Sequence, residues 1–174
     1  MKKIRGGEKL KIKLKEAKKE DLDFLAKVCR DAKDAYSEIM PEAFEKQAKE
    51  FEEHGLPEDY KIYVVKDDNK KIGFVGITDL TEQTAYLVGL YLLNDYQREG
   101  YGTATIDEVI KTLKDKDYNK ICLLVHNEAE WAIDFYKKEK FVSLTECEDI
   151  IKNYSGGKME DYYLPSTIFM EKNF

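Results

Sequence analysis

The sequence predicts one α/β domain built on a mixed β-sheet. Runs of strand type alternate with amphipathic helical stripes along the chain, and no linker, internal repeat or low-complexity tract interrupts them. The length of 174 residues suits a single domain with a sizeable core. We therefore expect residues 1–174 to form one domain, with residues 1–9 as a flexible polar leader.

A strand and two helices are predicted in the first third of the chain. Residues 10–14 alternate between apolar and polar side chains, which indicates a strand with one solvent-exposed face. An acidic start at Glu20 and Asp21 precedes a stripe with the i, i+3, i+4, i+7 spacing of a helix, formed by Leu22, Leu25, Ala26 and Cys29. Pro41 predicts the first turn of a second helix, and Gly55 its end.

Strands dominate the middle of the chain, and strands and helices alternate after it. Residues 60–66 and 71–78 predict a hairpin around a turn at 67–70, and residues 84–93 a third strand. A helix is predicted at residues 102–113 and another at 129–136. Between them, residues 121–125 form an apolar run typical of a strand covered on both faces. Two closing strands are predicted at residues 141–146 and 166–171. Gly156 and Gly157 are predicted to lie in a loop between the closing strands.

Composition excludes several classes of protein. The net charge is −6 and no basic face is visible, so nucleic acid is not an expected partner. The 3 cysteines lie far apart without a CxxC spacing, which speaks against a disulfide framework or a metal site. The sequence has neither a signal peptide nor an apolar run of roughly 18 residues. These patterns predict a cytoplasmic protein without a membrane partner.

The strongest motif follows the strand at residues 84–93. Its pattern is QxxGxG, formed by Gln97, Gly100 and Gly102, and an amphipathic helix begins at the glycines. The amides at a helix N-terminus carry partial positive charge, and glycines let an anion approach the backbone. No GK[ST] follows, and the spacing is not GxGxxG, so the loop fits neither the Walker nor the dinucleotide-binding pattern.

This motif resembles the central motif of the GCN5-related N-acetyltransferase (GNAT) family, [QR]-x-x-G-x-[GA], which follows a "LYV"-like triplet. Leu90, Tyr91 and Leu92 fill that triplet. A second family motif, N-x-x-A-x-x-[FY]-Y-x-x-x-G-F, is matched at Ala132, Phe135, Tyr136 and Phe141. The resemblance covers nearly the whole chain. It implies a mostly antiparallel central sheet of six to seven strands flanked by about four helices, in the order β-α-α-β-β-β-α-β-α-β-β.

Two positions depart from the second motif. Its asparagine, often a pantetheine contact in the family, falls on Ala129. Asn127 can supply a similar group, but Asn127 with Glu130 is also typical of a helix N-cap with a capping box, and we favour the cap. The glycine of the motif falls on Lys140, which predicts a different turn before Phe141.

The resemblance implies acetyl-CoA as the cofactor and acyl donor, with no metal. Pantetheine would contact backbone groups near Leu90 and Leu92, and the amides of residues 98 to 103 would hold the pyrophosphate. The full set of expected cofactor-binding residues is Leu90, Tyr91, Leu92, Gln97, Arg98, Glu99, Gly100, Tyr101, Gly102, Thr103, Asn127 and Phe135.

Acetyl transfer to an amine needs a neutral amine, a donor for the thioester oxygen and a proton for the leaving thiolate. Tyr136 matches the family tyrosine that protonates the sulfur, and it is the expected catalytic residue, with a core tyrosine as the alternative. The base is open. Some family members have a glutamate where this chain has Tyr86, a poor base at neutral pH. The remaining candidates are a water chain, Asp79, Glu82, His54 and His126.

The resemblance implies an acetyl-CoA-dependent N-acetyltransferase that moves the acetyl group directly to a primary amine of a small molecule. Residues 36–60 and 152–165, rich in tyrosine and carboxylates, are the expected acceptor-binding segments. One alternative is a peptide or protein N-acetyltransferase, and another is a non-catalytic acetyl-CoA-binding module. Family members are often dimers, so a homodimer is an open expectation.

Overall fold

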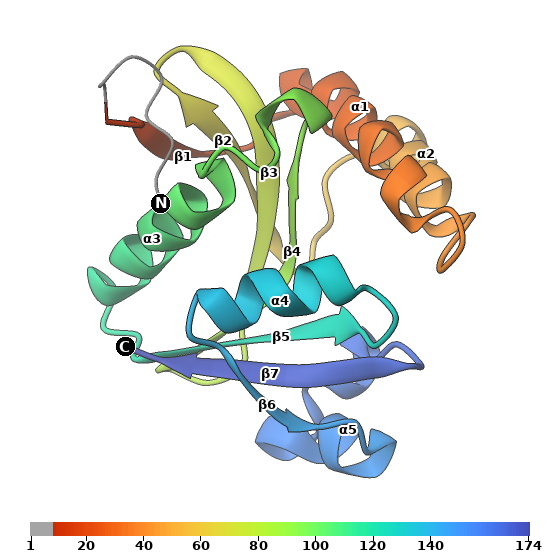
Figure 1. The fold of residues 1–174 in the computed structure, drawn as a ribbon, viewed down its shortest axis with the longest axis vertical. Helices are drawn as coiled ribbons and strands as arrows, with labels where there is room; N and C mark the ends of the chain where they lie inside the picture. Colours follow the sequence, from red (N-terminus) through yellow and green to blue (C-terminus); the bar gives the residue numbers. More distant parts are fainter. Residues whose placement is uncertain (1–8) are drawn as a thin grey trace. The chain divides into compact units, whose positions relative to one another are not determined.

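The computed structural model describes residues 9–174, and it confirms the predicted fold class (Figure 1). Within these residues seven strands form one sheet, hydrogen bonded in the order β1-β2-β3-β4-β5-β7-β6. The strands are β1 Ile12–Glu16, β2 Lys61–Asp67, β3 Lys70–Asp79, β4 Thr84–Leu92, β5 Lys120–His126, β6 Val142–Thr145 and β7 Thr167–Asn173. The five α-helices of the described residues are α1 Leu22–Ala32, α2 Ala43–His54, α3 Tyr101–Lys114, α4 Glu130–Lys138 and α5 Glu148–Gly157.

The chain divides into two compact units. The first contains the described residues up to Gly76 together with Gly89–Val109. The second contains Ile77–Val88 and Ile110–Phe174. β3, β4 and α3 each begin in one unit and end in the other, so the units share three continuous elements of the chain.

Strand β1 of the first unit pairs antiparallel with β2, from Ile12 opposite Asp67 to Glu16 opposite Tyr63. Helices α1 and α2 lie side by side (Figure 1) and bury their apolar faces in one core. The predicted stripe on α1 contributes to that core, since Leu25, Ala26 and Cys29 are at most 1% exposed. The core is completed by Ala17, Val28, Ala48, Phe51, Ile62, Val64 and Phe74.

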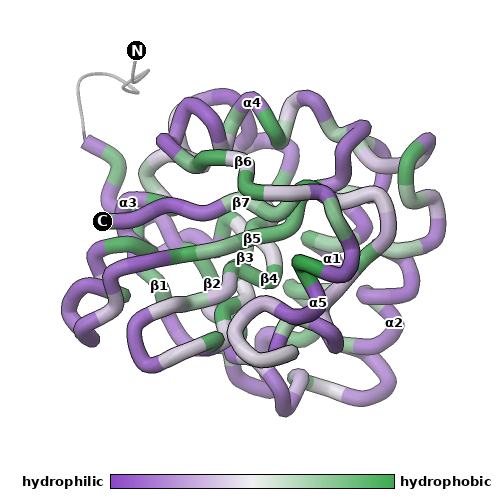
Figure 2. The backbone as a smooth tube through the Cα atoms, turned by 90° about the horizontal axis from the view of Figure 1, so that it is seen from below, coloured by the Kyte–Doolittle hydropathy of each residue, from purple (hydrophilic) through white to green (hydrophobic). Residues whose placement is uncertain are grey.

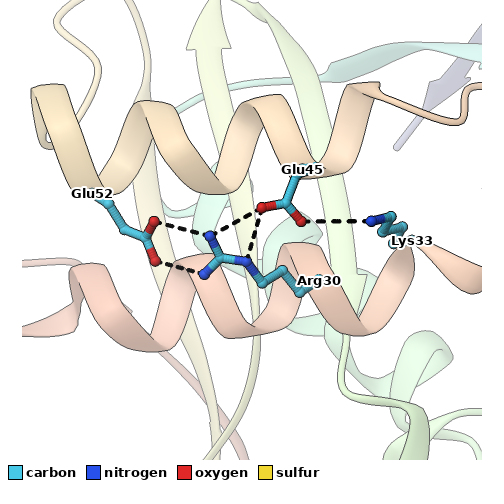
Figure 3. A network of polar contacts seen from close by, with 4 residues as sticks. All are labelled: Arg30, Lys33, Glu45 and Glu52. Carbon is cyan, nitrogen blue, oxygen red and sulfur yellow. Dashed lines mark hydrogen bonds and ion pairs between the residues drawn. The ribbon is translucent and has the colours of Figure 1, made fainter.

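The outer surface of α1 and α2 carries a polar network centred on Arg30 (Figure 3). The guanidinium donates from Nη1 and Nη2 to Glu52, at 2.5 and 2.9 Å, and from Nε and Nη2 to Glu45, at 3.3 and 3.2 Å. Lys33 Nζ lies 3.7 Å from the second oxygen of Glu45. The hydrogen bonds from Arg30 lower the pKa of both carboxyl groups. Because the network is exposed, it fixes how the helices pair more than it stabilises the fold.

In the second unit β4 and β5 are parallel, from Thr84 opposite Lys120 to Leu87 opposite Leu123, as the predicted crossover requires. β7 pairs antiparallel with β5 and with β6. Figures 1 and 2 show α4 and α5 on opposite sides of β5 and β7, which explains the continuous apolar run of β5. Figure 2 shows the hydrophobic colour along β5 and the hydrophilic colour along much of α2.

Two local features differ from the prediction, the additional helix α5 and the position of Pro41. The predicted loop at Gly156 and Gly157 coincides with a break at the end of α5, where the backbone leaves helical geometry at Tyr154, Ser155 and Gly156 and both glycines have positive φ. α5 was not predicted because Ile151 is its one buried residue, so it has no apolar stripe. Pro41 lies before α2, which begins at Ala43, rather than in its first turn. The predicted leader lies almost entirely outside the described residues, and no helix within those residues is long and apolar enough to cross a membrane.

Candidate functional site

The segment between β4 and α3 is held in place by side chains of its own. β4 ends at Leu92, a 3₁₀ turn (η3) spans Asn94–Tyr96, and α3 begins at Tyr101. Gln97 Nε2 donates to the main-chain oxygen of Leu92 at 3.2 Å and to Asn94 Oδ1 at 3.0 Å. The side chain of the motif glutamine therefore links the strand end to the turn and shapes the loop from within.

The backbone of this loop alternates in the sign of φ. Arg98 and Gly100 adopt positive φ values of 61° and 85°, on either side of Glu99. Such alternation turns successive amides toward one side and makes a concave group of N–H donors. The start of α3 adds the positive end of a helix dipole. A Cβ built on Gly100 would meet no atom within 4 Å, so the backbone there is open to a ligand.

Tyr101 fixes the start of α3. Its side chain is 3% exposed, and its hydroxyl donates to Asp67 Oδ2 at 3.2 Å. Its ring meets that of Tyr96 edge to face, with centroids 5.1 Å apart. Thr105 Oγ1 donates to the main-chain oxygen of Tyr101 at 2.7 Å. The side chain of Tyr101 is thus used for packing, and Gly102 and Thr103, the next two residues of α3, are half-buried.

The triplet before the loop is tightly packed against β3. The ring of Tyr91 lies 5.2 Å from that of Phe44 and 5.5 Å from that of Phe74, on the core side of the first unit. Leu92 is buried, and Leu90 is half-buried. A Cβ on Gly73 would lie 2.1 Å from the main-chain oxygen of Tyr91. The close approach therefore fixes the backbone of the triplet.

The predicted catalytic tyrosine belongs to the second unit. Tyr136 lies on α4, half-buried, with ring centroids 5.1 Å from Phe135 and 5.4 Å from Phe141. Lys140 has a φ of 69°, the left-handed conformation that glycine adopts most easily. The lysine at the motif's glycine position thus adopts a left-handed turn before Phe141.

Asn127 does not cap α4, contrary to the prediction. The residue is exposed, its amide donates to Ser166 O at 2.8 Å, and the N-cap of α4 is Ala129, which has no side-chain cap. The Ala129 amide donates to His126 O at 3.0 Å, so a turn intervenes and the helix begins later than Asn127 requires. The side chain of Asn127 is therefore not committed to the capping role.

The structure separates the candidates for the general base. Burial raises the pKa of Tyr86, and the neighbouring Tyr162 and Cys122 raise it further, so this phenol stays protonated at neutral pH. Nδ1 of His126 accepts the amide of Glu128 at 3.2 Å, which puts the proton of the neutral ring on Nε2. Tyr86 is therefore a poor base, and His126 stays a candidate.

The two carboxylate candidates belong to the second unit, and the second histidine candidate belongs to the first. Asp79 accepts the hydroxyl of Tyr118 at 2.5 Å, and Glu82 is exposed in the turn before β4. His54 ends α2 on the surface, 3.8 Å from Glu50. The general base therefore remains open among Asp79, Glu82, His54, His126 and a water chain.

Sequence reasoning missed one residue that contacts the loop. Asp31 Oδ2 accepts the amide of Asn94 at 2.7 Å, and Asn94 Nδ2 donates to the main-chain oxygen of Asp31 at 3.1 Å. The two positions are 63 residues apart in the sequence, and no local pattern links them. Among the described residues no group of His, Cys, Asp and Glu is arranged to hold a metal ion.

The chain belongs to the acetyltransferase (GNAT) family, whose family model matches residues 25–141. It is accordingly an N-acetyltransferase, and the strand, turn and glycine loop described above fall within the matched residues. The comparison with curated proteins gave no match.

Solved acetyltransferase structures share the fold. The PaiA N-acetyltransferase of Thermoplasma acidophilum, in complex with coenzyme A, is similar with a TM-score of 0.67 and 23% identity, over 95% of this chain and 100% of that one. The spermidine N-acetyltransferase of Vibrio cholerae, in complex with CoA and spermine, gives 0.64 and 18%, over 93% and 95%. The ribosomal-protein-S18-alanine N-acetyltransferase of Escherichia coli gives 0.63 and 18%, over 94% of each.

Proposed function

We propose that this protein transfers the acetyl group of acetyl-CoA directly to a primary amine of a small molecule. The observation that supports the proposal is the loop before α3, where positive φ at Arg98 and Gly100 and the helix start would suit an anion site. Two similar structures, the Thermoplasma and Vibrio enzymes, contain coenzyme A, and the second also contains spermine.

The residues fit a diphosphate without a cluster of cationic side chains. The amides of residues 98 to 103 would hold it, with Gln97 fixing the loop and Gly100 leaving it accessible. Main-chain groups of Leu90 and Leu92 would contact pantetheine. Asn127 and Phe135 are the proposed further contacts, and acetyl-CoA would supply the activated acyl group.

Proton transfer in this proposal involves Tyr136. The attacking amine must lose a proton, which a carboxylate, a histidine or a water chain would accept. The leaving thiolate must gain one, and the phenol of Tyr136 would donate it. A main-chain amide near Leu92 would donate to the thioester oxygen as charge develops on it.

The surface chemistry favours a cationic amine as the acceptor. The net charge of the chain is −6. Exposed carboxylates occur in both proposed acceptor segments, at Glu42, Glu53, Glu160 and Asp161. Amines are mostly protonated at neutral pH, so a negative field would raise their local concentration.

Calorimetry with acetyl-CoA, followed by an acceptor screen read by release of free CoA, tests the proposal. We expect binding, and turnover with polyamines, amino acids or aminoglycosides. Turnover with peptides alone would favour a peptide or protein acetyltransferase. Binding without turnover on any acceptor would favour a non-catalytic module, and absence of binding would overturn the proposal.

The role of Tyr136 has a separate test in Tyr136→Phe. The variant keeps the ring contacts with Phe135 and Phe141 and removes the hydroxyl. We expect kcat to fall by about 10- to 100-fold, since proton transfer contributes at least that much, while the affinity for coenzyme A stays the same. Tyr63→Phe is the control, because it removes a phenol hydroxyl on β2 to which the proposal gives no role. Equal rates in Tyr136→Phe and the parent would remove Tyr136 from the mechanism.

A further inference from the structure

Helix α1 and the turn before the anion loop exchange two hydrogen bonds. Asp31 is the penultimate residue of α1, and its Oδ2 accepts the main-chain amide of Asn94 at 2.7 Å. In return the side-chain amide of Asn94 donates to the main-chain oxygen of Asp31 at 3.1 Å. A carboxylate that accepts a backbone amide makes a stronger hydrogen bond than a neutral acceptor would.

The contact continues from Asn94 to the motif glutamine. Asn94 Oδ1 accepts from Gln97 Nε2 at 3.0 Å, and the same nitrogen donates to Leu92 O at 3.2 Å. A connected series of polar groups thus runs from α1 through η3 to Gln97. The residue after Gln97 is Arg98, where the backbone turns to positive φ.

Asp31 supplies a cap that the turn lacks in its own sequence. The N-cap of η3 is Leu93, which has no side chain able to accept the first amide of the turn. Asp31 accepts that amide from another helix. The side chain is half-buried and is not part of the apolar core of the first unit. Its removal would therefore release the turn without opening the core.

We propose that Asp31 is a positioning residue for the coenzyme loop, acting through Asn94 and Gln97 on the backbone that holds the diphosphate. The identity of the ligand rests on the proposed function. A loop that is already in its binding conformation loses less entropy on binding, and the apparent affinity falls with the fraction of molecules in that conformation. Without Asp31 this fraction decreases, so affinity for coenzyme A decreases while the fold persists.

The test compares Asp31→Ala, Asp31→Asn and the control Asp34→Ala by calorimetry with coenzyme A and by thermal unfolding. Asp34 is an exposed aspartate three positions along the chain, and its main-chain oxygen accepts from the hydroxyl and the amide of Ser37. We expect Asp31→Ala to raise the Kd by about 3- to 10-fold. Asp31→Asn, which keeps an acceptor oxygen, should bind nearly as the parent does. Asp34→Ala should bind as the parent does.

A double variant shows whether the effect passes through Asn94. If it does, Asp31→Ala combined with Asn94→Ala weakens binding no more than Asn94→Ala alone, because interacting residues are not additive. A parent-like Kd for Asp31→Ala, or fully additive losses, would overturn this inference and leave the proposed function intact. A parent protein that does not bind coenzyme A would instead overturn the proposed function.

Discussion

Gly100 and Gly55 form a matched pair at the scale of single residues. Both have a φ of 85°, and a Cβ on either would meet no atom within 4 Å. Gly55 follows α2, whereas Gly100 lies in the anion loop. An aspartate introduces backbone strain at both positions, but only at Gly100 would it place negative charge beside the proposed diphosphate.

We expect Gly100→Asp to abolish or strongly weaken binding of coenzyme A, and Gly55→Asp to bind as the parent does. Both variants should lose stability. Calorimetric titration and thermal unfolding of the three proteins measure these effects. An unchanged Kd in Gly100→Asp would contradict the assignment of the loop.

Lys140 gives a second prediction at this scale. Its φ of 69° costs a residue with a side chain roughly 1–2 kcal/mol, which exceeds the roughly 0.5–1 kcal/mol that glycine's extra freedom costs. Lys140→Gly should therefore stabilise the protein by about 0.5–1 kcal/mol. Lys137→Gly, within α4, should instead destabilise it by about 1 kcal/mol. Denaturant unfolding measures both, and a loss of stability in Lys140→Gly would contradict the argument.

The sequence predicted the components of the candidate site that are local in the chain. The glycine loop follows directly from residue spacing, because its backbone conformation is set within a few residues. The left-handed turn at Lys140 was not predictable, since lysine gives no sign of positive φ. The contact of Asp31 with Asn94 depends on how α1 packs beside η3, and neither segment contains information about the other.

At the scale of elements, Asp21 links the start of α1 to the sheet. Its carboxylate accepts the amide of Lys18 at 2.8 Å and the ammonium of Lys71 at 2.6 Å. Burial opposes ionisation of Asp21, but the bonds from Lys71 and Lys18 prevail and hold its pKa below the usual 3.8. A lowered pKa stabilises the fold above pH 3.8, and this contribution is lost as the pH falls through the folded value.

We expect Asp21→Asn to be less stable than the parent at pH 7, and the difference to shrink toward pH 3. Urea unfolding at the two pH values measures it. Asp23→Asn is the control, because Asp23 is an exposed carboxylate in the same turn of α1. A difference that stayed constant between pH 7 and pH 3 would show that the ionised carboxylate of Asp21 is not the stabilising group.

Elements were predictable where one face is buried. α1, α3 and β5 have regular apolar patterns, and the structure places them where those patterns predict. α5 escaped prediction because solvent surrounds most of it and its backbone breaks near Gly156. The ends of α2 and β1 differ from the predicted ends by one to two residues, because apolar spacing does not define where an element ends.

At the scale of the whole molecule, we propose that the chain is one domain in the thermodynamic sense. β3, β4 and α3 are each continuous between the two units, so neither unit has a complete set of elements without the other. We expect a single calorimetric transition whose van't Hoff and measured enthalpies agree. Two resolved transitions would show that the units unfold separately.

The contact between Gly73 and the oxygen of Tyr91 restricts which sequences this fold accepts. An added methyl group would collide with main-chain atoms of β4, and main chain cannot rotate away as a side chain can. Saturation mutagenesis at position 73 should therefore recover glycine alone among functional clones. Selection for glycine at position 73 would preserve the spacing between β3 and β4. It would thereby also preserve the position of the end of β4, where the coenzyme loop begins.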